Sequence, residues 1–189
     1  MVNKKLGFTL FEIMMVMAVI GIFAAIAIPS FTRQKKVDWK LILNEVNNLA
    51  SIARQETIIT PMTTCRLSFS NADEIYKIVV EKQQTDAETG KISYAQLNSS
   101  YFQTEYQLPK NLIIKAAYLN TNKPELFAEN KGKAFCYMAP CGLSQELMVH
   151  VAETSKDAKN EIHKTLHMLP FFSKFELLDD WIKPEKSKP

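Results

Sequence analysis

The sequence is short of glycine, cysteine and net charge, and each shortage excludes a class of protein. Its 189 residues include 5 Gly and 3 Cys, too few for a collagen-like chain or a disulfide framework. The 47% of hydrophobic residues excludes a wholly disordered chain and suits one domain of ordinary size. A net charge of +3 is too small to indicate a nucleic-acid partner by itself.

The sequence also lacks the common catalytic and nucleotide-binding motifs. It contains no G-x-S-x-G and no H-E-x-x-H pattern, which hydrolases and zinc proteases need for their nucleophile or metal. Neither Gly90-Lys91 nor Gly132-Lys133 follows the upstream glycine of a phosphate-binding loop. We therefore expect no enzyme activity, no cofactor and no small-molecule substrate.

One long apolar run stands near the N-terminus. Residues 8–28 read FTLFEIMMVMAVIGIFAAIAI, and only Thr9 and Glu12 are polar. As a helix rising about 1.5 Å per residue, the run would be about 31 Å long, which matches the hydrocarbon core of a bilayer. The sequence therefore predicts a single membrane span.

The flanks of this run differ from those of a secretory signal peptide. Ala27-Ile28-Pro29 offers no small-residue cleavage site after the run. The charged leader of residues 1–7 instead ends just before it. Cleavage after Gly7 would leave the whole apolar helix in place, with Phe8 as the new N-terminus.

Glu12 is the most informative residue of the run, because a carboxylate in hydrocarbon is costly and usually faces a partner. A second interpretation is open: Glu12 lies one turn into the span, where it can reach the interface, stay protonated or benefit from the helix N-terminus. After cleavage, Phe8 would carry a free α-amino group four residues before Glu12. Every neighbouring copy would present the same positive group.

Taken together, the pattern K-K-L-G followed by F-T-L-F-E and an apolar run resembles the type IV prepilin signature of pilins and pseudopilins. The resemblance implies that a prepilin peptidase cuts between Gly7 and Phe8 and methylates Phe8. It implies a filament in which Glu12 faces a neighbour's N-terminus, and helix-weakening positions at Gly21 and Pro29. The implied partners are other pilin or pseudopilin subunits, membrane lipid and an inner-membrane assembly platform.

The resemblance also implies an N-terminus in the cytoplasm and a head in the periplasm, at the bacterial inner membrane. Lysine and arginine counts do not settle this topology, because Lys4 and Lys5 on one side face Arg33, Lys35, Lys36 and Lys40 on the other.

Beyond the span, the pattern predicts an α+β fold. Apolar residues three or four apart predict an amphipathic helix from about residue 30 to 59, joined across Pro29 into one helix of roughly fifty residues. After residue 61, apolar and polar residues alternate, which predicts an antiparallel sheet against this helix. The polar residues 83–90 are expected to form an exposed connection. The ambiguous segment 160–172 leans towards a strand. The predicted strands are 65–69, 75–81, 91–97, 112–118, 134–138 and 147–151.

The expected organisation is the lollipop of a pilin: a leader (1–7), a transmembrane half-helix (8–29), a periplasmic head (30–183) and a disordered tail (184–189). Two head segments, LASIARQETIITPMTTCRLSF (49–69) and FCYMAPCGLSQELMVHV (135–151), resemble H-type minor pseudopilins of type II secretion systems and FimT-like minor pilins. Residues 163–181 depart from that pattern.

The resemblance therefore implies a structural subunit of a protein-export filament. Two alternatives stay open: a FimT-like minor pilin that binds DNA or a surface, and a periplasmic enzyme or binding protein on a simple anchor. Basic residues of the head form no run, so we do not expect nucleic acid as a partner.

Three cysteines in a periplasmic compartment permit one disulfide. Cys136 and Cys141 are the candidate pair, because a turn at residues 138–140 would bring them together, whereas Cys65 lies on a presumed core strand. Pairing of Cys65 with either partner and three buried thiols are the alternatives.

His163 and His167 would share a face of a helix or of a strand, with Glu161 and His150 as additional candidate ligands. No further pattern supports a metal site, so we expect none. The aromatic run that includes Phe171, Phe172, Phe175 and Trp181 is expected to be a core strand rather than an exposed patch.

Overall fold

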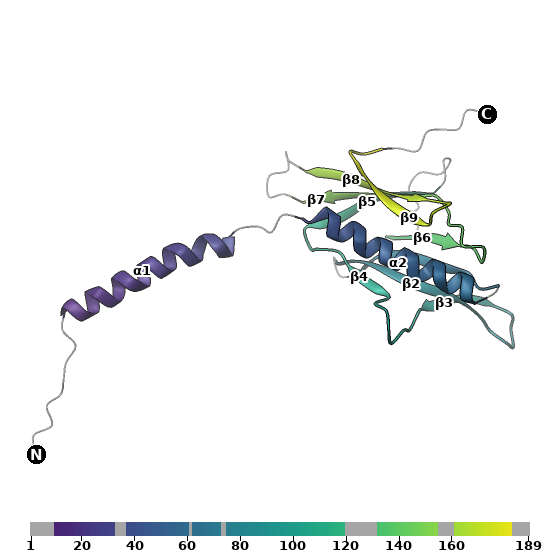
Figure 1. The fold of residues 1–189 in the computed structure, drawn as a ribbon, viewed down its shortest axis with the longest axis horizontal. Coiled ribbons are helices and arrows are strands. Elements are labelled where there is room, and N and C mark those ends of the chain that lie inside the picture. Colours follow the sequence, from purple (N-terminus) through teal and green to yellow (C-terminus); the bar gives the residue numbers. More distant parts are fainter. Residues whose placement is uncertain are drawn as a thin grey trace, which may run out of the picture. The chain divides into compact units, whose positions relative to one another are not determined.

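The computed structural model describes residues 10–32, 37–60, 62–72, 75–119, 132–154 and 161–182, with the side chains of the first segment described through residue 25. The chain divides into two compact units, Met1–Lys36 and Val37–Pro189 (Figure 1). We call the second unit the head. The predicted leader (1–7) and tail (184–189) lie outside the described residues.

The first unit contains helix α1, Leu10–Thr32. Glu12 is the one charged residue in its sequence. The backbone is helical through both Gly21 and Pro29. Apolar helix-forming residues thus give a helix where the sequence predicts the transmembrane half.

The head begins with helix α2, Trp39–Ile59. Asp38 is its N-cap: the backbone of Asp38 is extended, and its carboxylate accepts hydrogen bonds from the amides of Lys40 and Leu41 at 3.1 and 3.2 Å. An aspartate that satisfies the first free N–H groups of a helix defines where that helix starts. The expectation of one continuous helix is therefore wrong, because Val37 and Asp38 are not helical and α2 starts afresh at Trp39.

Five antiparallel strands form the first sheet, in the order β3-β2-β1-β6 with β4 also paired to β2. They confirm the predicted strands between residues 65 and 97 and at 134–138. The strands are β1 (Cys65–Ala72), β2 (Ile75–Thr85), β3 (Ile92–Gln96), β4 (Glu105–Gln107) and β6 (Lys133–Met138).

The connection predicted at residues 83–90 is shorter than expected. Strand β2 continues to Thr85, because Gln83 pairs with Tyr94 and Thr85 with Ile92 across the β2–β3 hairpin. The turn itself starts at Asp86, whose carboxylate accepts hydrogen bonds from the amides of Glu88 and Thr89. Cross-strand pairing thus overrides the polar composition of these residues.

A second antiparallel sheet holds four strands in the order β5-β7-β8-β9. It confirms the strand predicted at 160–172, and its strand β9 lies within the aromatic run around Phe175 that was expected to be a core strand. The head therefore has two sheets where one was expected. The strands are β5 (Leu112–Leu119), β7 (Leu147–Glu153), β8 (Ile162–Leu169) and β9 (Lys174–Asp179).

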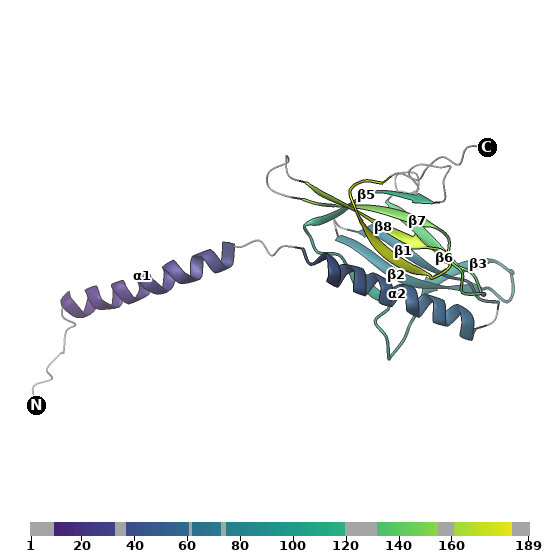
Figure 2. The same ribbon diagram turned by 45° about the horizontal axis from the view of Figure 1, so that its top comes forward.

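Helix α2 lies alongside the strands of the head (Figure 2), and one apolar core joins it to both sheets. Helix α2 contributes one face to it, namely Ile42, Val46, Leu49, Ala50 and Ala53. The largest fully buried side chains come from both sheets, including Phe69, Ile78, Leu147, Leu166 and Phe175. Every residue of this core lies within Val37–Pro189, so the head does not need α1 to bury its apolar surface.

Asn47 connects α2 to the edge of the second sheet. Its side-chain amide donates to the carbonyl of Phe175 at 3.1 Å, and its side-chain oxygen accepts from the amide of Phe175 at 2.6 Å. One side chain thus replaces the neighbouring strand that β9 would otherwise need at this point. Asn47 is not one of the apolar residues whose spacing predicts α2, so the sequence analysis missed this role.

We expect the substitution Asn47→Ala to destabilise the head by about 2 kcal/mol, because it leaves both backbone groups of Phe175 without a partner. Urea unfolding of residues 37–189 measures this free energy. The matched control is Asn44→Ala, which removes an exposed amide from the same helix and is expected to change stability by less than about 0.5 kcal/mol. Equal effects of the two substitutions would contradict the proposed role of Asn47.

Candidate functional site

Helix α1 exposes apolar side chains around its whole circumference. A soluble helix keeps a polar face, whereas a helix that is apolar all round has to be covered by lipid or by other helices. The exposed residues are Leu10, Phe11, Ile13, Met14, Met15, Val16, Met17, Val19, Ile20, Ile22 and Phe23. The surface of α1 is therefore the strongest candidate for an assembly surface.

Glu12 lies on this apolar surface. It is exposed, and it lines one shallow hollow of the helix together with Ile13, Val16 and Met17. Gly7 and Phe8, the residues of the predicted cleavage site, lie outside the described residues. The structure thus describes one half of the predicted Glu12–Phe8 pair.

The predicted kink positions differ in what the structure describes. A Cβ atom at Gly21 would meet nothing within 4 Å, so this glycine is not needed for close packing in the single chain. The backbone of Pro29 is helical, and its side chain lies outside the description. Bending at either position stays a prediction about assembly.

The side chains of α1 are described through residue 25. Within the described residues, no helix is long and apolar enough to cross a membrane.

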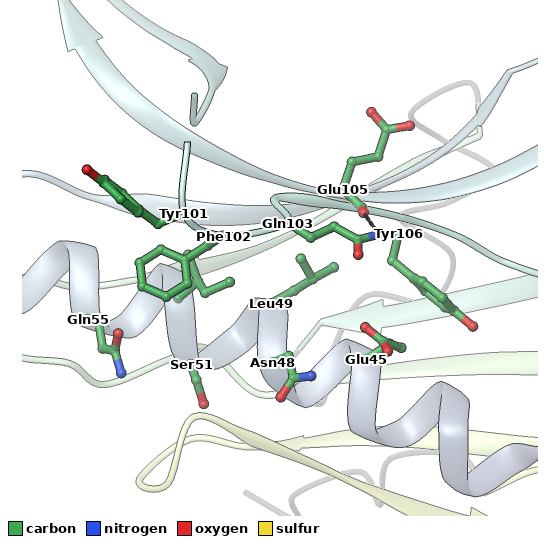
Figure 3. A pocket seen from close by; sticks show the side chains of 11 residues that line it. Glu45, Asn48, Leu49, Ser51, Gln55, Tyr101, Phe102, Gln103, Glu105 and Tyr106 are labelled. Atoms are coloured by element: carbon green, nitrogen blue, oxygen red, sulfur yellow. Dashed lines mark hydrogen bonds between the residues drawn. The ribbon is translucent and has the colours of Figure 1, made fainter. Parts of the chain in front are cut away.

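The head carries a groove of about 460 Å³ between α2 and the loop that leads into β4 (Figure 3). Asn48, Ser51 and Gln55 line it from the helix, and the exposed rings of Tyr101 and Phe102 stand on the opposite side. Its remaining lining residues are Glu45, Leu49, Ile52, Gln103, Glu105 and Tyr106. No lining residue is basic, so the groove suits a neutral or cationic group rather than an anion.

The acidic side of the groove is held in place by an ion pair. Glu105 lies 3.0 Å from the Lys77 ammonium, and its hydrogen bond to that group lowers the pKa of the Glu105 carboxyl. Gln103 donates its amide to the carbonyl of Glu105 at 2.8 Å. The sequence analysis missed this groove, because its residues come from a helix face and a distant loop that share no motif.

All three cysteines are free thiols, so the candidate bridge between Cys136 and Cys141 is not formed in this structure. Cys136 points into the core from β6, whereas Cys141 is exposed in the turn that follows. The Cys136 thiol instead lies 3.4 Å from the carbonyl of Gln145. The expected turn does form, with the amide of Gly142 donating to the carbonyl of Ala139, but Cys136 is buried and Cys141 is exposed.

The candidate metal ligands lie on the second sheet, each with its own partners. His167 contacts Glu176 at 2.8 Å and Glu146 at 2.9 Å through its two ring nitrogens. His163 lies 3.6 Å from Glu161. Within the described residues, no three His, Cys, Asp or Glu side chains are arranged to hold a metal ion.

His150 is buried, and its Nδ1 lies 2.9 Å from the Thr165 hydroxyl. Its ring stacks on Trp181, with the ring centroids 4.6 Å apart. The expected aromatic core strand is correct for Phe175, which is buried in β9, and wrong for Phe171 and Phe172, which are exposed in the preceding turn. The three histidines therefore contribute to packing and side-chain pairing on the second sheet.

Comparison with known proteins supports the N-terminal signature. Residues 2–28 match a family model described as the prokaryotic N-terminal methylation motif. This match confirms the predicted type IV pilin signature, which implies a membrane-anchored N-terminus. No curated protein matches the chain significantly.

Two solved structures of the minor pseudopilin EpsH from the type 2 secretion system of Vibrio cholerae are similar to this chain. The first has 10% sequence identity and a TM-score of 0.46, and the match covers 76% of this chain and 98% of EpsH. The second has 11% identity and a TM-score of 0.48, and the match covers 77% of this chain and 96% of EpsH.

We expect Cys141 alone to react with N-ethylmaleimide in the native protein at pH 8. Burial raises the pKa of Cys65 to about 11 and that of Cys136 to about 12, so both remain protonated at this pH, and only the thiolate reacts quickly. Intact-mass measurement should show one adduct in the native protein and three in guanidinium. A native protein with no adduct, or with more than one, would contradict this expectation. The control is Cys141→Ser, which should show no adduct in the native protein.

Proposed function

We propose that this chain, which carries the type IV pilin methylation signature at its N-terminus, is a minor pseudopilin or pilin subunit of a short filament that serves protein export. In this proposal a prepilin peptidase cleaves between Gly7 and Phe8 and methylates Phe8. The processed subunit is held in the bacterial inner membrane, and its head lies in the periplasm. An assembly platform in that membrane then inserts it into the filament.

The observation that carries the proposal is the surface of α1. Its exposed apolar side chains cover every face, and Glu12 is the one charged residue of the helix. Lipid alone could cover the apolar side chains, but it offers no countercharge to a carboxylate. A filament of like subunits supplies both, because neighbouring helices cover one another and each brings a charged N-terminus.

The proposed mechanism is charge neutralisation in an apolar environment. A carboxylate without a countercharge costs on the order of 3 kcal/mol in hydrocarbon. The methylated amine of Phe8 from a neighbouring copy offsets this cost only when the two helices have the correct axial offset. Apolar contacts between the helices add adhesion but let one helix slide along the other. The ion pair therefore selects the axial register of neighbouring helices.

We expect Glu12→Ala to leave cleavage intact and to reduce incorporation into the filament at least tenfold, because the N-terminus of the neighbour loses its countercharge. Quantitative immunoblots of sheared filaments against membranes measure incorporation. Thr9→Val is the matched control, since it removes the other polar residue of the run without a change in charge. Incorporation of the Glu12→Ala subunit at the wild-type level would exclude the ion-pair mechanism.

We expect Gly7→Val to block processing, because the branched side chain occupies the position before the scissile bond. An unprocessed band on a gel and an intact-mass measurement that still includes residues 1–7 would show this result. Gly21→Ala is the control, because an added Cβ at Gly21 meets no atom within 4 Å; it should be processed normally. A Gly7→Val protein that starts at Phe8 would refute the assigned cleavage site.

A further inference from the structure

Strand β3 is an outer strand of the first sheet, and β2 is its paired neighbour. Directly after β3, the amide of Leu97 donates to the carbonyl of Val80 in β2 at 2.9 Å. Directly before β3, the carbonyl of Lys91 accepts from the amide of Asp86 at 3.0 Å. These two bonds fix the direction in which each backbone group of β3 points, because residues two apart in an antiparallel strand face the same neighbour.

Alternate residues of β3 direct their backbone groups away from β2. Ser93 and Ala95 face β2, in step with the two flanking residues. The N–H and C=O groups of Ile92, Tyr94 and Gln96 therefore face the other side. Within the described residues, the sheet has no strand on that side. The edge of β3 thus offers a row of donors and acceptors, which the backbone of another extended polypeptide matches.

Two other outer strands of the head are closed by a side chain. In β9, Asn47 bonds the N–H and the C=O of Phe175 at 2.6 and 3.1 Å. In β4, the side-chain amide of Gln103 donates to the carbonyl of Glu105 at 2.8 Å. Each side chain takes the place that the backbone of an added strand would need.

The remaining two outer strands are hindered by backbone or by charge. Along β6, the amide of Gln145 donates to the carbonyl of Tyr137 at 2.9 Å, so the segment after the β6–β7 turn occupies that side. Strand β5 changes register between Ile114 and Ala116, and exposed Lys115 stands at this bulge. Bulges and lysines are features that prevent the addition of a strand to natural sheets.

Strand β3 has none of these features. Its sequence ISYAQ contains no charged residue, no proline and no glycine. Its register with β2 continues over five pairs without a shift. The hairpin is held in shape by Asp86, whose carboxylate accepts hydrogen bonds from the amides of Glu88 and Thr89. A regular, uncharged outer strand of this kind is open to the addition of a second strand.

Tyr94, at the centre of β3, is already fixed in position by its neighbours. The guanidinium carbon of Arg66 lies 4.1 Å from the centroid of the Tyr94 ring, and the ring of Tyr137 meets it edge-on with the centroids 5.7 Å apart. Arg66 is in turn paired with the Glu81 carboxylate at 2.5 Å. The Tyr94 ring therefore loses little further freedom when a strand packs beside it, which lowers the cost of binding.

We propose that the open edge of β3 pairs with β3 of a second copy of this chain, antiparallel and centred on Tyr94. In this register Tyr94 lies opposite Tyr94 of the second copy, and Ile92 lies opposite its Gln96. Each of these residues donates one backbone hydrogen bond and accepts another. No charged side chain stands opposite a like charge, so β3 complements its own edge in length and in charge.

The charges on either side of β3 favour this antiparallel arrangement. The turn before β3 contains Asp86, Glu88 and Lys91, whereas the segment after it, LNSSYFQT (97–104), contains no charged residue. Two antiparallel copies place the charged turn of one beside the uncharged segment of the other. A parallel pair would instead bring the two charged turns together, with like charges at equivalent positions.

This contact is separate from the assembly surface proposed for α1. It concerns the head alone, so it does not depend on how the N-terminus is processed or on Glu12. Two paired strands of this length bury little surface, so we expect a weak dimer in solution. Disulfide trapping detects such a dimer and also reports its register.

The trapping experiment uses the head (residues 37–189), whose core is complete without α1, with Cys141→Ser to remove the exposed thiol. Two variants then carry either Ile92→Cys or Gln96→Cys. In the proposed register these two positions lie opposite each other, with Cα atoms about 5.5 Å apart, which suits a disulfide. Each position lies about 14 Å from the same position of the second copy. We expect a cross-linked dimer when the two variants are mixed under mild oxidation, and none from either variant alone.

A second measurement tests the backbone pairing itself. The variant Gln96→Pro removes an N–H group that faces the open side, and it leaves the bonds between β3 and β2 in place. We expect it to weaken self-association of the head roughly tenfold or more in sedimentation equilibrium. The matched control is Gln96→Ala, which removes the same side chain but keeps the N–H group and should associate as the wild type does. Circular dichroism and thermal unfolding check that both variants are folded.

Three results would overturn the proposal. The first is a mixture of the two cysteine variants that gives no cross-link, which would leave the edge of β3 to a strand of a different polypeptide. The second is a cross-link formed by Gln96→Cys alone, because it would require another register. The third is equal self-association of the Gln96→Pro and Gln96→Ala heads, which would place the contact elsewhere on the head.

Discussion

The apolar surface of α1 has to be removed from water, and the rest of the proposed function depends on this constraint. A helix with exposed Leu, Ile, Met, Val and Phe side chains on every face has no orientation in which a single globular head could cover it. Its cover must come from lipid, from other copies, or from both. Glu12 then becomes decisive, because a charge in such surroundings stabilises only the arrangement that supplies its countercharge.

The head is built so that it can stand apart from this helix. Its core includes α2 and both sheets, and Asn47 completes the edge of β9 where a further strand would otherwise be required. The Asp38 cap starts α2 anew after α1. A self-contained head allows the anchor and the head to meet different partners, which is what a filament subunit in a membrane requires.

The outer features of the head divide into those that are satisfied internally and those that are open. His167 lies between Glu146 and Glu176, and His150 is stacked on Trp181, so these side chains already have partners. The groove beside Tyr101 and the side chains of Phe171 and Phe172 are open. They differ in chemistry, because amides, carboxylates and a hydroxyl line the groove beside its apolar and aromatic side chains, whereas the two phenylalanine rings carry no polar group.

The sequence by itself determined the features that depend on neighbours along the chain. The prepilin signature is confirmed over residues 2–28, and the periodicity of apolar residues predicted α2 and most strands, since one element's pattern reflects which of its faces is buried. Tertiary structure decided what depends on residues far apart in the chain. The role of Asn47 depends on β9 lying beside it, and the exposure of Phe171 and Phe172 against the burial of Phe175 follows from where the β8–β9 turn falls. Cys136 and Cys141 are close in sequence, yet Cys136 is buried in β6 while Cys141 is exposed in the turn that follows.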